Sequence, residues 1–332
     1  MGRSVWVVVG VSISVVVVIV GGILAAWLGA FDGDEDGAGA EAAVREYLEL
    51  VEDGQAEQAT RMVPLARTRL DGDDEFLKDE MLDAADERIV VGDVRTTWSH
   101  ENKATVSAEY RLGDEDVRIE VRTEYVGDTW KVLDTLAERV LIRTNMPTLD
   151  HAKIGDIEVP VTTKPVLDDE SQEILLYPGE YTVSGTDVEH LSWVADPVAV
   201  FDEDVYSHVQ PLEVALTYQA EESLASAVTG HVVDFVRTCV AAAPELGTPS
   251  AECQQVVTAP EVRKNDKLSV LEMPRVDEID TRHATGDGWQ FFSTVGTLRN
   301  TPADGVVGES AFQVQGFVSV SPDGELKIAY RT

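Results

Sequence analysis

The feature that most constrains this chain is a long uncharged segment near its N-terminus. No charged residue occurs between Ser4 and Phe31, and the stretch consists mainly of Val, Ile, Leu, Ala and Gly. About 20 apolar residues suffice to cross the ~30 Å hydrocarbon layer of a bilayer. A secretory signal peptide has a shorter apolar core, of about 7–15 residues, followed by a cleavage site. The segment therefore predicts an uncleaved transmembrane helix over about 5–28.

The residues that flank this helix indicate its orientation. Arg3 is the only charged residue before it, and 32–36 (DGDED) is acidic directly after it. Basic residues favour the cytoplasmic side of a membrane, and paired cysteines favour an oxidising compartment. We therefore expect a single-pass protein of the cell membrane, with a cytoplasmic N-terminus and extracytoplasmic C-terminal domains. Only residues 1–4 would lie in the cytoplasm.

Small residues within the apolar segment offer a contact between membrane helices. Gly22 and Ala26 have the small-xxx-small spacing that lets two helices approach closely. A homodimer through the transmembrane helix is one expectation, and a helix that faces only lipid is the alternative.

The charge balance excludes one class of partner. The chain has 26 Lys+Arg against 61 Asp+Glu, which gives a net charge of −35. Such a surface repels phosphate backbones, so nucleic-acid binding is not expected. It also repels anionic lipid headgroups, so the soluble part should stand off the bilayer rather than lie on it.

Composition and periodicity divide the chain into five segments. We predict a transmembrane anchor over 1–31, an acidic linker over 32–40, an α+β domain over 41–147, an all-β module over 148–218 and a second α+β domain over 219–332. The linker begins like an EF-hand calcium loop (D-x-D-x-D-G). The twelfth position of such a loop needs a bidentate Glu, and Ala43 stands there, so a calcium site is not expected.

The first domain changes from helical to strand periodicity along the chain. Apolar residues at helical spacing predict helices over 41–54, 55–63 and 73–87. Alternating residues then predict strands at 89–97, 103–112 and 116–134, with turns at 98–102 and 113–115.

This order of elements resembles a known superfamily. Helices, long antiparallel strands and a closing W-K-V (130–132), together with the G-Q-A-E of 54–57, resemble the cone-shaped α+β domains of the nuclear-transport-factor-two-like superfamily over about 41–145. More narrowly, they resemble the versions that bacteria tether behind a membrane helix. The resemblance implies a cone whose interior holds an Asp, His or Tyr in the enzymes of the superfamily and no chemistry in many other members.

The two later segments carry weaker signals. Short apolar runs separated by Pro, Gly and Asp predict strands over 148–218, and 177–183 (YPGEYTV) resembles the turn and strand of PEGA-like β-modules, which usually act as spacers or adhesion surfaces. The last segment resembles the C-terminal part of anchored envelope proteins of high-GC Gram-positive bacteria (actinobacteria). Within it we predict a helix at 222–243 and strands near 268–273, 288–298, 310–320 and 325–330.

The spacing of the cysteines favours a disulfide over other cysteine chemistry. Cys239 and Cys253 are too far apart for C-x-x-C, so neither a thioredoxin-like site nor a zinc ribbon is indicated. A bridge between them would close a short loop and contribute about 3 kcal/mol of stability.

No arrangement of residues predicts a catalytic, cofactor-binding or metal site. The six histidines are scattered without a pair at helical spacing, and the chain has no nucleophile elbow, P-loop or dinucleotide-binding glycine motif. The strongest enzymatic alternative is a pocket inside the cone. Its groups would be Tyr47, Trp98, His100, Tyr110 and Tyr125. However, His100 falls in a predicted turn and the tyrosines fall on the apolar phase, where packing is the usual role.

The leading functional expectation is therefore non-enzymatic. We expect a membrane-anchored extracytoplasmic binding or scaffold protein whose partner is another envelope protein or polymer. A small-ligand binder or enzyme with a pocket in the cone is the alternative. A cone filled by side chains would favour the first expectation, and a deep cavity the second. If the protein is a binding or scaffold protein, His100→Ala and Tyr110→Phe should leave its function unchanged.

Overall fold

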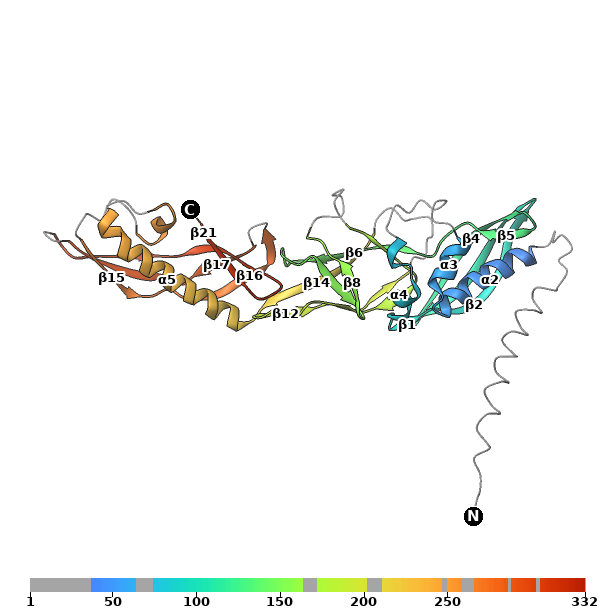
Figure 1. The fold of residues 1–332 in the computed structure, drawn as a ribbon, viewed down its shortest axis with the longest axis horizontal. Helices are drawn as coiled ribbons and strands as arrows, with labels where there is room; N and C mark the ends of the chain where they lie inside the picture. Colours follow the sequence, from blue (N-terminus) through green and yellow to red (C-terminus); the bar gives the residue numbers. More distant parts are fainter. Residues whose placement is uncertain are drawn as a thin grey trace, which may run out of the picture.

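The protein is described here from a computed structural model. It describes residues 37–63, 74–163, 172–201, 211–246, 250–257, 266–285, 288–302 and 305–331. The predicted transmembrane helix, its orientation, the Gly22 and Ala26 contact and most of the acidic linker lie outside the described residues. Within them the chain is mixed α+β, with mostly antiparallel sheets and few helices, which confirms the predicted class. These parts lie one after another in an elongated molecule (Figure 1).

The first region packs helices against one face of a four-stranded antiparallel sheet. The helices are α2 (Ala38–Glu52), α3 (Ala56–Met62) and α4 (Asp79–Asp83), with a 3-10 turn at Asp74–Phe76. The sheet contains, in order, β2 (Val90–His100), β3 (Lys103–Leu112), β4 (Glu115–Val126) and β5 (Thr129–Val132). Apolar stripes explain the packing, because Val44, Tyr47, Leu48 and Val51 of α2 are all buried, as their spacing predicts.

Two predicted elements of this region differ from the structure. The predicted helix over 73–87 is only the 3-10 turn and α4, because the chain after α4 is extended and Asp86 N–H donates to Glu180 O at 2.8 Å. The predicted strand over 116–134 is two strands joined at Gly127 and Asp128. Their φ angles of 59° and 70° match the type I′ turn that tight hairpins favour.

The middle region is built from strands, as predicted for 148–218. One sheet has the order β12–β14–β6–β9, and two three-stranded sheets have the orders β11–β7–β8 and β1–β10–β13. Their bounds are β1 (Glu87–Arg88), β6 (Glu138–Thr144), β7 (His151–Ile154), β8 (Ile157–Pro160), β9 (Ile174–Leu176), β10 (Gly179–Tyr181), β11 (Val183–Ser184), β12 (Leu191–Val194), β13 (Val198–Val200) and β14 (Leu212–Ala220). β6 pairs in parallel with β14. The predicted first domain thus contributes a strand to the middle sheet.

The C-terminal region lays one long helix, α5 (Glu222–Leu246), along two antiparallel sheets (Figure 1). The sheets are β15–β18–β19 and β16–β17–β20–β21. Their bounds are β15 (Lys267–Glu272), β16 (Val276–Thr285), β17 (Gly288–Ser293), β18 (Gly296–Thr301), β19 (Gly308–Phe312), β20 (Gln315–Val320) and β21 (Leu326–Tyr330). β16 was not predicted, because its sequence is mostly polar and only Val276 and Ile279 of its described side chains are buried.

The helix α5 confirms the predicted helix at 222–243. By length and composition alone it could also cross a membrane. It has a buried stripe, however: Leu224, Val228, Val232 and Val236 belong to the hydrophobic core. In the structure α5 is therefore an amphipathic helix packed on sheets.

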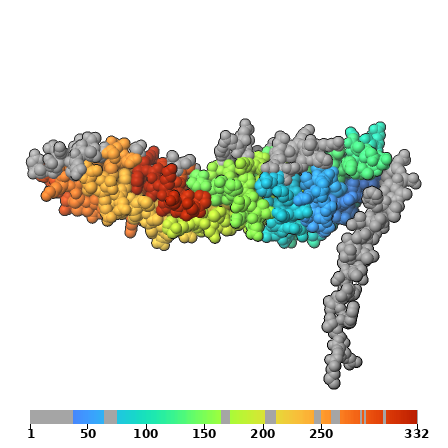
Figure 2. Space-filling model, in the orientation of Figure 1, coloured from blue at the N-terminus to red at the C-terminus, as the bar shows by residue number. Residues whose placement is uncertain are grey.

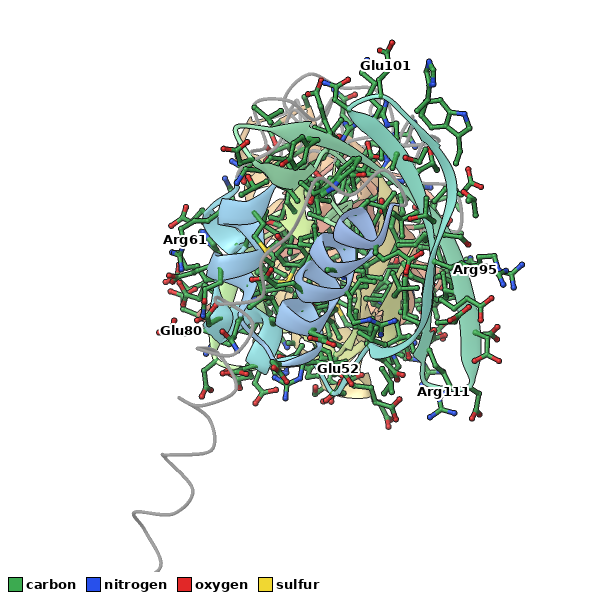
Figure 3. The ribbon with its side chains drawn as sticks, turned by 90° about the vertical axis from the view of Figure 1, so that its right-hand side faces the viewer. Glu52, Arg61, Glu80, Arg95, Glu101 and Arg111 are labelled. Atoms are coloured by element: carbon green, nitrogen blue, oxygen red, sulfur yellow. A yellow bond between two sulfur atoms is a disulfide. The ribbon has the colours of Figure 1, made fainter. Side chains whose placement is uncertain are left out.

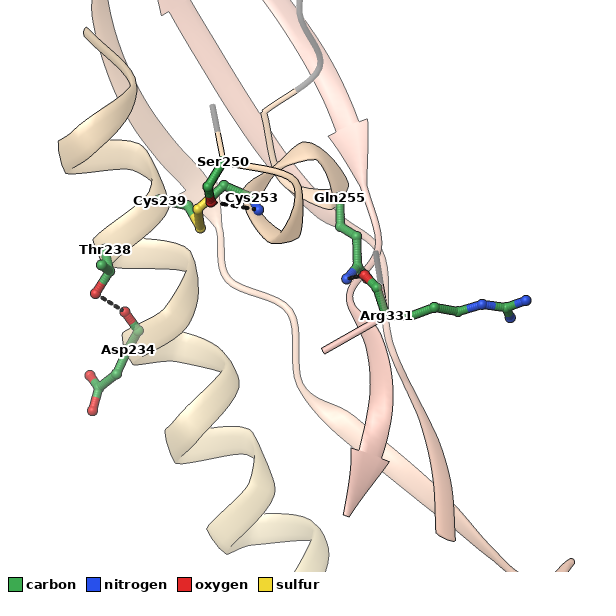
Figure 4. Close-up of a disulfide and its surroundings, with 7 residues drawn as sticks. All are labelled: Asp234, Thr238, Cys239, Ser250, Cys253, Gln255 and Arg331. Carbon is green, nitrogen blue, oxygen red and sulfur yellow. Dashed lines mark hydrogen bonds between the residues drawn. A yellow bond between two sulfur atoms is a disulfide. The ribbon is translucent and has the colours of Figure 1, made fainter. Parts of the chain in front are cut away.

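A disulfide joins Cys239 of α5 to Cys253 in the 3-10 turn Glu252–Gln255, as the spacing predicted (Figure 4). The Cα atoms are 5.3 Å apart. Cys239 is buried within the core, so the bridge pins the end of the helix to the loop that follows it.

Candidate functional site

The interior of the first region is organised around the buried phenol of Tyr47. This side chain of α2 is completely buried, and its hydroxyl accepts a hydrogen bond from Leu136 N–H at 2.8 Å. The Thr135 hydroxyl lies 3.4 Å from it. Burial, the largest cause, raises the pKa of Tyr47 well above its usual value. The phenol is therefore held neutral as a structural hydrogen-bonding group rather than poised as an acid or base.

Side chains from the middle region close this interior. Tyr177, in the loop between β9 and β10, meets Tyr47 edge to face with ring centroids 6.5 Å apart. The Tyr177 hydroxyl lies 3.0 Å from the Thr60 hydroxyl of α3. Leu175 of β9 is also completely buried in the same hydrophobic core. Among the described residues, side chains from both regions thus pack together in this interior.

Of the other candidates for a pocket, Tyr110 belongs to the same hydrophobic core and the rest lie toward the surface. Tyr110 is buried at 2 % exposure, whereas Trp98 is 51 % exposed and Tyr125 is 38 % exposed. Two details differ from the sequence prediction. β2 continues to His100, so the turn is only 101–102, and Tyr125 is exposed because β4 extends beyond the part of the sheet that the core covers. His100 lies on the surface beside Glu101, with Nε2 4.0 Å from its carboxylate.

The described residues offer no metal centre. In that part of the chain no three His, Cys, Asp or Glu side chains are arranged to hold a metal ion. The run that resembles an EF-hand begins in residues outside the described ranges.

Described residues form two surface grooves of similar volume. A groove of about 630 Å³ runs over the outer face of β2, β3 and β4, where the Arg118 guanidinium pairs with the Glu109 carboxylate. A second groove of about 620 Å³ lies between α5 and β15, with Val240, Leu268 and Val270 along it and Arg237 and Lys267 at its border. Ser269 and Asp266 also line the second groove, where the Asp266 carboxylate accepts a hydrogen bond from the Asn300 side-chain amide at 3.2 Å.

Exposed aromatic side chains gather where the two hairpins of the first sheet end. We call this region the aromatic tip, and it consists of Trp98, His100, Tyr125, Val126 and Trp130. The rings of Trp98 and His100 are 6.2 Å apart, and those of Tyr125 and Trp130 are 5.6 Å apart. The hairpins are joined by a hydrogen bond from Tyr125 N–H to Asn102 O at 2.7 Å. Sequence reasoning missed this cluster, although aromatic residues next to both turns were a signal for it.

Comparison with known proteins gives no relative from which a role could be transferred. No protein-family model matches the chain, and no curated protein matches it.

Proposed function

We propose that this protein is a non-enzymatic, single-pass membrane protein whose extracytoplasmic part is a rigid spacer. It holds its C-terminal end away from the membrane and presents it to another envelope protein or polymer. The observation that carries the proposal is that the regions lie in line (Figure 2) and are joined by buried side chains and hydrogen bonds. A rigid elongated body suits a scaffold, whereas a pocketed enzyme needs a cavity.

Asn145 supports the rigidity of the junction between the middle region and the C-terminal region. Its side-chain amide donates to Tyr218 O of the middle sheet and to Thr281 O of the C-terminal sheet, each at 2.8 Å. Tyr218 N–H donates back to the Asn145 side-chain oxygen at 2.7 Å. The indole N–H of Trp289 donates to Asn145 O at 2.8 Å. Polar groups satisfied in this way fix one relative position of the two regions.

The junction between the first region and the middle region supports the same conclusion. The side chains of Leu175 and Tyr177, which belong to the middle region, are buried in the core of the first region. Bending at this junction would therefore expose buried apolar surface. The same contacts weigh against the alternative of an enzyme or small-ligand binder, because they occupy the interior where its pocket would lie. The likenesses to the nuclear-transport-factor-two-like superfamily, to PEGA-like modules and to actinobacterial envelope proteins are part of this proposal.

The anchor and the partner can be tested in native membranes. We expect intact protein to stay with membranes after carbonate washing and to begin at or near Met1. A mature N-terminus between Ala26 and Glu41 would contradict the anchor. For the partner, a photo-crosslinking residue at Val306, which is 92 % exposed, should capture an envelope component. The same residue at Val90, 48 % exposed in the first region, is the matched control and should not capture it. Equal capture at both positions would contradict presentation by the C-terminal end.

A further inference from the structure

We propose that the aromatic tip rests on the surface of the membrane that anchors the chain, at the level of the lipid headgroups. This inference depends on the anchor of the proposed function, and it adds a second contact between the protein and the bilayer. The contact would set the angle at which the elongated body leaves the membrane. Four observations support it: the place where the described chain begins, the length of the tether, the exposed side chains and the local charge.

The described chain begins against the aromatic tip. Gly37, its first residue, accepts a hydrogen bond from the Thr96 hydroxyl of β2 at 3.0 Å. A Cβ atom placed on Gly39 would lie 2.6 Å from the Trp130 ring, so the start of α2 is in close contact with the tip. α2 begins at the same end of the molecule as the turn between β4 and β5 (Figure 1). Glu101, in the other turn, lies at the rim of this end (Figure 3).

The tether is too short to let this end move far from the membrane. Residues 29–36 separate the predicted transmembrane helix from Gly37, and a fully extended chain of that length spans roughly 30 Å. A short tether keeps the effective concentration of the tip near the lipid surface high, on the order of millimolar. Weak contacts that would not bind a free protein are then populated.

The exposed side chains are of the kind that headgroup regions accept. Trp98 is 51 % exposed, Tyr125 38 % and Val126 47 %. Trp and Tyr combine an apolar ring with one polar group, and they are enriched where hydrocarbon meets water. A register shift between Thr96 and Trp98 pairs Trp98 with Thr105 and places it on the outer face of the sheet, whereas alternation along β4 places Tyr125 on the face that α2 covers. Aromatic rings therefore flank the turns on both sides, which suits contact of the turns end-on with a lipid surface.

The aromatic tip is electrically neutral within a strongly acidic protein. Segments 97–104 and 122–132, which form it, carry equal numbers of acidic and basic side chains: Glu101, Glu124 and Asp128 against Lys103, Arg122 and Lys131. The chain as a whole has a net charge of −35. The side chains of these two segments therefore add no net repulsion from anionic headgroups, and the acidic run 32–36 lies outside them.

A fluorescent probe can test the contact in the full-length chain. Both native cysteines form the disulfide, so a cysteine in Val126→Cys is the single free thiol. The protein is labelled with an environment-sensitive dye and reconstituted into vesicles of phosphatidylcholine and phosphatidylglycerol that contain nitroxide lipids. We expect a blue shift and a loss of roughly half of the emission, as for a group at the headgroup level. The matched control is Val194→Cys, which is 50 % exposed in the middle region and should show neither effect.

A second variant tests whether the aromatic rings cause the contact. Trp98→Glu with Tyr125→Glu, on the Val126→Cys background, should abolish the blue shift and the quenching while flotation with vesicles is unchanged. Both side chains are exposed, so the melting temperature should stay close to that of the parent. If the double variant folds poorly, Trp98→Glu alone takes its place. It keeps the pair of Tyr125 and Trp130 intact and should reduce the quenching.

The outcomes separate this inference from the proposed anchor. A probe at 126 that is as unquenched as the probe at 194, in protein that floats with the vesicles, would overturn the membrane contact and leave the anchor standing. Protein that does not float would overturn both. A blue shift that persists in detergent and grows with protein concentration would assign the aromatic tip to a second copy of the chain instead of to lipid.

Discussion

At the scale of single residues, Tyr47 shows how one hydroxyl secures a loop inside a core. Its oxygen accepts from Leu136 N–H at 2.8 Å, in a place that water does not reach. We predict that Tyr47→Phe lowers the free energy of unfolding by about 1–3 kcal/mol, because a buried N–H loses its acceptor. Urea denaturation measures the change. The control is Tyr125→Phe, which removes a hydroxyl from an exposed ring and should change stability by less than about 0.5 kcal/mol.

Buried tyrosines also predict how stability depends on pH. Burial raises the pKa of Tyr47, Tyr177 and Tyr181 above their usual values. In the unfolded chain a tyrosine ionises near pH 10, so above this pH the unfolded state releases protons that the folded state keeps. The stability that these groups contribute is therefore fully present below about pH 10 and decreases as the pH rises above it.

The contribution of Tyr47 to this loss of stability at alkaline pH can be measured separately. Each such tyrosine contributes up to about 1.4 kcal/mol of destabilisation per pH unit once it is ionised in the unfolded state. Tyr47→Phe should therefore show a shallower loss of stability than the parent between pH 10 and 12, in denaturation curves recorded at each pH. Equal slopes for the two proteins would contradict the buried, neutral state of this phenol.

The sequence predicts the role of Tyr47 only in part. Its position on the apolar stripe of α2 predicts burial, together with Val44, Leu48 and Val51. Its partner Tyr177 lies far along the chain, in a different predicted segment, and no local pattern links the two. For Trp98 the sequence does not predict even burial, because a position beside a turn does not indicate whether the ring packs inward or is exposed.

At the scale of elements, α2 protects the edge of the first sheet. The outer strand β2 has amide groups that no neighbouring strand can pair with, and such edges attract other chains. The Glu41 carboxylate of α2 accepts from Thr96 N–H at 2.6 Å, and Glu52 accepts from Val91 N–H at 3.4 Å. Side chains of the helix thus occupy positions that a foreign strand would use.

This protection can be measured by hydrogen exchange. We predict that Glu41→Ala increases the exchange rate of the Thr96 amide by about tenfold, which corresponds to the loss of ~1.4 kcal/mol of protection. Glu46→Ala, at an exposed position of the same helix, should leave that amide unchanged. If the Thr96 amide exchanges at the same rate in Glu41→Ala as in the parent, the carboxylate does not protect the edge.

The disulfide stabilises the end of α5. We predict that Cys239→Ala with Cys253→Ala lowers the free energy of unfolding by about 3 kcal/mol, because the unfolded chain regains the freedom of the closed loop. Calorimetry of the variant beside the parent measures this change. Quantitative alkylation of both thiols without prior reduction, in protein from its native compartment, would show that the bridge is not formed there.

Elements were predictable where one face of a strand or helix is buried and the other is not. β4 is the best case, since Val117, Ile119, Val121 and Thr123 are buried and the residues between them face outward. The predicted helix over 73–87 failed because a contact distant in sequence, Asp86 with Glu180, decides the conformation there. The parallel pairing of β6 with β14 was not predictable either, because long connections leave no local signal of strand partner.

At the scale of the whole molecule, the hydrogen bonds of Asn145 couple the middle region to the C-terminal region. We predict that Asn145→Ala lowers the free energy of unfolding by about 1–3 kcal/mol and separates thermal unfolding into two transitions, since the amide groups that it satisfies lose their partners. Differential scanning calorimetry resolves the transitions. Asn102→Ala, at an exposed turn, is the matched control. A single sharp transition in Asn145→Ala would show that apolar packing alone couples the regions.

The parallel pair of β6 and β14 has a mechanical consequence. The first region leads into the start of β6, and α5 leaves from the end of β14, so in the proposed spacer, tension between the membrane and a partner would pull these ends in opposite directions. Val140–Thr144 lie beside Leu212–Leu216 in continuous register. The hydrogen bonds of this ladder cross the direction of the pull and are loaded together, in shear, rather than opened one after another. We expect a molecule built in this way to yield late and abruptly under force, and the proposed spacer would then transmit tension along its length.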